Sequence, residues 1–220
     1  MLLLPLLILP ALVMAACGGA QPEPAPTPTL AENAARVTEL ERLDKGQLKD
    51  VAYAPDGEHL AVGTTTAVYL YDADSFDLRW SVGTPEEVAV MAFSPSGRVL
   101  AAGLSDGSIW LLRAQDGALT RTMLGHSGYV SDLVFSPDGA TLASAGGDGI
   151  VQLWRAGDGA LRHTLAASPR SDRDEDVGGS VWVQAIAFSP DGERLATASN
   201  DGFLRIWRVA DGALLEILEG

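Results

Sequence analysis

The sequence predicts an all-β protein of four similar units, each made of four short antiparallel strands. The first observation is a recurring turn, A-P-D-G at 54–57, S-P-S-G at 94–97 and S-P-D-G at 136–139 and 189–192. The prolines of these turns lie 40, 42 and 53 residues apart. A second turn follows in three units as Asp-Gly, at 116–117, 158–159 and 211–212. Two turns between short apolar runs, repeated about every 40 residues, are typical of four-stranded β-propeller blades.

The first two strands of each unit flank the Ser-Pro-Asp-Gly turn. Proline supplies the fixed φ of a type I turn, aspartate accepts hydrogen bonds from nearby backbone, and glycine closes the turn. The runs before the turn, such as V-M-A-F at 90–93, and after it, such as V-L-A-A at 99–102, are largely apolar on both faces. This composition is expected of strands packed between neighbouring sheets.

The third and fourth strands of each unit have more polar character. The third strand alternates more clearly, as in I-V-Q-L-W at 150–154 and F-L-R-I-W at 203–207. The fourth strand, A-L-R-H-T-L at 160–165, has the mixed composition of an outer edge. No helical periodicity competes after residue 46.

Residues 47–218 resemble four tandem WD repeats, and the third unit matches the pattern of that family fully. It has Gly125-His126 at the Gly-His position, Ser144 in the second strand, Asp148 in the tight turn and Trp154 in the third strand. In the family these side chains form a hydrogen-bonded network inside the blade. The resemblance therefore implies a structural role for His126, Ser144, Asp148 and Trp154.

The other units depart from this pattern. The fourth unit keeps Thr197, Asp201 and Trp207 but has Gly179 at the histidine position, and the second unit keeps Asp106 alone. The expected blades span 47–83, 84–125, 126–179 and 180–220. Rings of this family resemble seven-bladed discs most often, so we expect these four blades to be part of a longer propeller. A four-bladed ring and an eight-bladed ring of two chains are the alternatives.

The first 46 residues precede the repeats. Residues 1–16 are predicted to be a signal peptide, since the apolar run is shorter than the ~20 residues of a transmembrane helix and contains two prolines. The small pair before Cys17 resembles a bacterial lipoprotein signal, although no basic residue precedes the apolar run. A plain signal peptide, or a buried apolar segment with an incidental cysteine, is the alternative. Residues 17–34 would then be a lipidated N-terminus and a proline-rich linker. Residues 35–46 are expected to be a ring-closing strand or, from their composition, a short helix.

Charge and side-chain chemistry exclude several functions. The chain has 15 basic and 29 acidic residues, a net charge of −14, which repels nucleic acid. G-L-S-D-G at 103–107 matches a nucleophile-elbow motif, but it falls in a predicted hairpin instead of a strand-to-helix turn. The three histidines have no metal-ligand spacing. We expect no catalytic residue, cofactor or metal.

An insertion lengthens the segment between the third and fourth units. It contains alternating carboxylates at Asp172, Asp174 and Asp176, followed by Gly178, as in some calcium loops, but lacks a bidentate glutamate at the required distance. An acidic surface loop is the simpler interpretation, and a cation loop is the alternative.

These features predict a lipid-anchored, extracytoplasmic scaffold that binds a protein or peptide and catalyses no reaction. A propeller enzyme or cofactor binder of the quinoprotein or lactonase type, and the sensor domain of a larger protein, are the alternatives.

Overall fold

The computed structural model describes residues 46–166 and 181–219. The chain divides into two compact units, Met1–Glu39 and Leu40–Gly220, and all the described residues belong to the second. The predicted lipidation site Cys17, the segment 35–45, Gly179 and the three aspartates of the possible cation loop lie outside the described residues. None of the described residues forms a helix with the length and hydropathy needed to cross a membrane.

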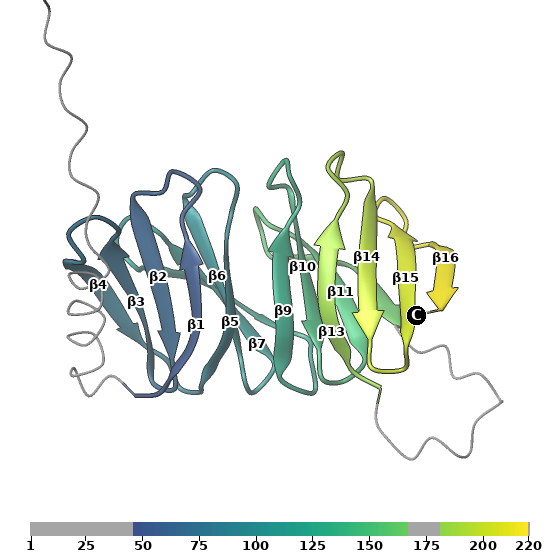
Figure 1. Ribbon diagram of the computed structural model, residues 1–220, viewed down its shortest axis with the longest axis horizontal. Coiled ribbons are helices and arrows are strands. Elements are labelled where there is room, and N and C mark those ends of the chain that lie inside the picture. Colours follow the sequence, from purple (N-terminus) through teal and green to yellow (C-terminus); the bar gives the residue numbers. More distant parts are fainter. Residues whose placement is uncertain (1–45, 167–180, 220) are drawn as a thin grey trace, which may run out of the picture. The chain divides into compact units, whose positions relative to one another are not determined.

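The predicted all-β fold is confirmed by four separate four-stranded antiparallel sheets, which we call blades one to four (Figure 1). Each blade is formed by consecutive strands, and each strand pairs with the next one along the chain. The strands of blades one and two are β1 Leu48–Tyr53, β2 His59–Thr64, β3 Ala67–Asp72, β4 Leu78–Gly83, β5 Val88–Phe93, β6 Val99–Leu104, β7 Ser108–Arg113 and β8 Leu119–Leu124. Those of blades three and four are β9 Val130–Phe135, β10 Thr141–Gly146, β11 Ile150–Arg155, β12 Leu161–Ala166, β13 Val183–Phe188, β14 Arg194–Ser199, β15 Phe203–Arg208 and β16 Leu214–Glu219.

The predicted turns connect the first and second strands of each blade. In blade three the Gly139 N–H donates to the Ser136 carbonyl at 2.8 Å, and Gly139 has φ = +70°. The Ser136 hydroxyl donates to Asp138 at 2.5 Å and also accepts from the Thr141 N–H at 2.9 Å. Blade four repeats this arrangement with Ser189 and Asp191. The turn is therefore a local unit that any blade of the chain can form.

Burial follows the position of a strand within its blade. The second strand of blade three, β10, is buried along its whole length, whereas β16, the fourth strand of blade four, is exposed along its whole length. Between the blades, apolar side chains form three clusters that each combine residues of adjacent sheets, for example Leu153 of β11 with Val183 of β13. The hydrophobic core thus consists of stacked layers between blades, because each sheet buries its faces against its neighbours.

Aspartates on two first strands link neighbouring blades. Asp50 on β1 accepts from the Met91 N–H of β5 at 2.6 Å, and Asp132 on β9 accepts from the Ile186 N–H of β13 at 2.8 Å. Burial raises the pKa of Asp132 above its usual range, although the two backbone N–H groups whose hydrogen bonds it accepts oppose this change. These contacts attach each of the two strands to the first strand of the next blade.

Candidate functional site

The third blade brings together the four side chains that the WD pattern singles out. The His126 Nε2 atom lies 2.8 Å from the Ser144 hydroxyl, and the Trp154 indole N–H donates to the same hydroxyl at 2.9 Å. On the other side of the ring, His126 Nδ1 lies 3.1 Å from Asp148 Oδ1. Asp148 also accepts the backbone N–H of Ser127 at 2.9 Å.

The donors and acceptors of this network match one another. Ser144 accepts from the indole and has one proton left to donate to His126 Nε2, so that Nδ1 carries the hydrogen that Asp148 accepts. The His126 side chain is fully buried and that of Asp148 is 7% exposed. A buried and fully paired histidine stabilises the blade and has no free nitrogen for a substrate or a metal ion.

The fourth blade has an incomplete version of this network and an arginine that sequence reasoning missed. The Trp207 indole N–H donates to the Thr197 hydroxyl at 3.0 Å. Asp201 is instead paired with Arg205 of β15, whose two terminal nitrogens donate at 3.2 and 2.6 Å. The Arg205 side chain is 4% exposed. Arg205 therefore supplies the donors for the turn aspartate that His126 supplies in blade three.

The nucleophile-like motif lies in a β-hairpin. Ser105 follows β6 and precedes β7, and its backbone N–H donates to the Glu87 carbonyl at 2.9 Å. Asp106 in the same turn accepts the Ser108 hydroxyl at 2.6 Å. Because the next element is a strand, Ser105 lacks the strand-to-helix turn that exposes such a nucleophile.

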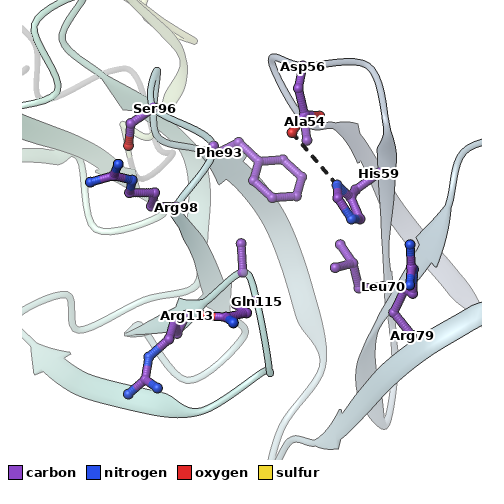
Figure 2. A pocket seen from close by; sticks show the side chains of 12 residues that line it. Ala54, Asp56, His59, Leu70, Arg79, Phe93, Ser96, Arg98, Arg113 and Gln115 are labelled. Atoms are coloured by element: carbon purple, nitrogen blue, oxygen red, sulfur yellow. Dashed lines mark ion pairs between the residues drawn. The ribbon is translucent and has the colours of Figure 1, made fainter.

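A cavity of about 580 Å³ opens between blades one and two, at the end of the sheets that carries the Pro-Asp-Gly turns. Figure 2 shows residues of blade one on one side of it and residues of blade two on the other. We call it the inter-blade pocket and define it by six of its lining residues, His59, Leu70, Arg79, Phe93, Arg98 and Arg113. Its volume lies in the range of small-ligand sites.

Charged and apolar groups are both present in the inter-blade pocket. Arg79 pairs with Asp72 at 3.0 Å and Arg113 with Asp116 at 2.9 Å, in each case on the surface. Leu70 is buried, and Phe93 is half-buried. Asp56 lies 3.8 Å from His59 at the rim, and together with Glu58 they form the group of potential metal ligands found among the described residues. Asp56 and Glu58 of that group are exposed in the turn, and His59 is the half-buried first residue of β2.

Sequence reasoning did not find this pocket, because its residues come from five strands and three turns of two blades. One signal was present in the sequence. The turn of blade two reads S-P-S-G-R, whereas the turns of the other blades each contain Pro-Asp-Gly.

The fold places the chain among proteins built of β-propeller-type blades, and the network of blade three matches the pattern of WD40 repeats. The model of the family described as "WD domain, G-beta repeat" matches residues 81–111, 117–155 and 177–208. Among solved structures, a chain from "Crystal Structure of Mitotic Checkpoint Complex" has a TM-score of 0.70 and 26% sequence identity, over 80% of this chain and 52% of that chain.

Two curated proteins are also similar to this chain. Human WD repeat-containing protein 86 is 46% identical over 43 residues, which are 20% of this chain and 11% of that protein. Mouse telomerase protein component 1 is 28% identical over 168 residues, which are 76% of this chain and 6% of that protein. The chain thus spans only a small part of the length of these two relatives.

Proposed function

We propose that this protein is a WD-repeat scaffold that binds other proteins and is held at the extracytoplasmic side of a membrane by a lipid on Cys17. The observation that carries the scaffold role is the set of three segments matched by the WD40 family model within a stack of four packed blades. WD40 propellers typically act as scaffolds without enzymatic activity, and the similar solved chain comes from a crystal structure of a complex.

The blade network supports a scaffold role over a chemical one. His126, Asp148 and Ser144 would be a reactive set if they were exposed, but they are buried and paired with one another. Because these side chains are buried inside the blade, a substrate in solution does not come within hydrogen-bond reach of them. The loops and clefts around the blades are left as the surfaces available to a partner.

The membrane anchor is supported by the sequence. Two small residues precede Cys17, the chain's one cysteine, and a proline-rich stretch follows it. Each buried methylene of an acyl chain contributes about 0.8 kcal/mol, so two or three chains on one residue hold a protein stably at a bilayer.

The anchor and the scaffold role are tested separately. Cells that express the full chain are grown with labelled palmitate, and we expect label in the wild type and none in Cys17→Ala. A wild type without label rules out the lipid anchor. Cross-linking on intact cells, followed by mass spectrometry, is expected to capture the same protein partner repeatedly. If the full chain captures no protein above a control with an unrelated lipoprotein, the scaffold proposal is wrong.

A further inference from the structure

The inter-blade pocket is bordered by the turn that departs most from the repeat. The positions of Ser96 and Arg98 in blade two are occupied by Asp56 and Glu58 in blade one, by Asp138 and Ala140 in blade three, and by Asp191 and Glu193 in blade four. From these two positions the turns of blades one, three and four carry formal charges of −2, −1 and −2, whereas the turn of blade two carries +1. The departure concerns charge alone, because Gly97 keeps the positive φ of the other turns.

Two further arginines reach the same pocket. Arg79 comes from β4 and Arg113 from the end of β7, so that both blades contribute a guanidinium. Their ion pairs with Asp72 and Asp116 are exposed, and such pairs are worth about 1 kcal/mol or less. Arg98 is exposed, and its side chain has no hydrogen bond or ion pair within the described part of the chain. Arg98 is therefore available to an anion at the mouth of the pocket, and Arg79 and Arg113 can turn to the same anion by giving up their weak surface ion pairs.

The floor of the pocket is apolar. The buried Leu70 of β3 and the half-buried ring of Phe93 at the end of β5 lie between the charged residues of the two blades (Figure 2). A ligand that carries only charge would leave this surface in contact with water. A ligand with an apolar group next to its anionic group would cover the surface and meet the arginines at the same time.

We propose that the inter-blade pocket binds a peptide segment in which an anionic side chain stands beside an apolar one. This inference rests on the proposed scaffold function and identifies the surface and the chemistry of the partner. Among the residues that line the pocket, three arginines outnumber one aspartate, Asp56, and this local excess of positive charge favours such a segment on a chain whose net charge is −14. The anion can be a carboxylate or a phosphate, since a guanidinium binds both in the same bidentate way.

The test is an NMR titration of the full chain, labelled with nitrogen-15, with four probes. Three are capped tetrapeptides that differ at one position, Gly-Leu-Glu-Gly, Gly-Leu-Gln-Gly and Gly-Leu-phosphoserine-Gly, and the fourth is inorganic phosphate. We expect saturable shifts of the amides of Ser94 and of residues 96–98 with the two anionic peptides. The neutral peptide is expected to bind about tenfold more weakly or worse, because it loses one charge-assisted contact. Phosphate alone is expected to bind more weakly than the phosphopeptide. The tighter of the two anionic peptides shows which anion the partner carries.

A double variant removes the charge without changing the fold of the turn. Ser96→Asp with Arg98→Glu converts the turn to S-P-D-G-E, the sequence that blade four already folds at 189–193. It should reduce the affinity for both anionic peptides about tenfold or more at an unchanged melting temperature. The matched control is the reverse exchange in blade four, Asp191→Ser with Glu193→Arg, which should leave this binding unchanged.

The outcomes separate this inference from the scaffold proposal. Absence of saturable shifts at 94–98 with either anionic peptide, equal binding of the glutamine peptide, or full binding by the double variant each overturns the pocket assignment. Cross-linking with the double variant then shows where the partner binds. If the variant captures the cellular partner as well as the wild type does, the scaffold role stands and the pocket assignment is wrong. If the wild type captures no partner but the peptides bind as expected, the scaffold proposal alone fails.

Discussion

Gly107 and Gly202 occupy the same position of the turn between the second and third strands, in blades two and four. Substitution of both by alanine separates the cost of a positive φ from the cost of a clash with the next blade. Both have a left-handed backbone, with φ of +85° and +83°. A Cβ atom at Gly107 would lie 2.5 Å from the His126 carbonyl oxygen and 2.6 Å from that of Gly128, which lead into the next blade. A Cβ at Gly202 would meet no described atom within 4 Å.

Alanine at either position costs about 1 kcal/mol because L-residues avoid this φ. At Gly107 the two carbonyl oxygens must also move, and they belong to the segment that positions His126. We expect this displacement to add about 2 kcal/mol, since it disturbs backbone and a buried hydrogen-bonded network. Gly107→Ala should therefore destabilise the protein by about 3 kcal/mol and Gly202→Ala by about 1 kcal/mol.

The measurement is urea unfolding of the full chain, followed by tryptophan fluorescence, for the wild type and both variants. A difference of about 2 kcal/mol corresponds to about 4 to 8 °C in melting temperature for a protein of this size. If the two variants unfold at the same urea concentration, the backbone of the next blade does not restrict the side chain at position 107. The reasoning that neighbouring blades are packed backbone to backbone at this point would then be wrong.

Three further predictions concern the networks and the turns. His126→Ala leaves the Ser144 hydroxyl without an acceptor, Asp148 without one of its donors, and a cavity, and it should lower the free energy of unfolding by about 2 to 4 kcal/mol, whereas the half-buried His163→Ala should cost less than about 1 kcal/mol by the same urea assay. Arg205→Met leaves Asp201 without its two guanidinium donors and should cost about 2 to 3 kcal/mol, compared with a negligible effect of the exposed control Arg194→Met. The Ser136 and Ser189 hydroxyls hold the pKa of Asp138 and of Asp191 below their usual value of 3.8. A carboxyl whose pKa is lowered by folding stabilises the protein above that value, and this contribution is lost as the pH falls through the lowered pKa. Melting temperature should accordingly fall in this acidic range, and the double variant Asp138→Asn with Asp191→Asn should show a shallower fall. An equally steep fall in the double variant would contradict the assignment.

The sequence alone was sufficient for the all-β class and the four-strand repeat. The Ser-Pro-Asp-Gly turn is formed by four consecutive residues, so that its hydrogen bonds do not depend on distant parts of the chain. The grouping of His126, Ser144, Asp148 and Trp154 followed from the family pattern, and the structure brings these four side chains into contact.

Tertiary structure decided what lies between blades. In the fourth unit the sequence has Gly179 at the histidine position and did not predict a partner for Asp201, whereas the structure pairs Asp201 with Arg205 of β15. The inter-blade pocket is lined by Arg79 from blade one and Arg98 from blade two. A Cβ atom at Gly107 would clash with backbone atoms that lead into the following blade. The spacing of turn residues and apolar runs along the sequence predicts each hairpin. The angle and distance at which two sheets pack depend on all the side chains between them. For that reason the sequence determined the blades of this protein, and only the packed structure revealed the pocket between the first two.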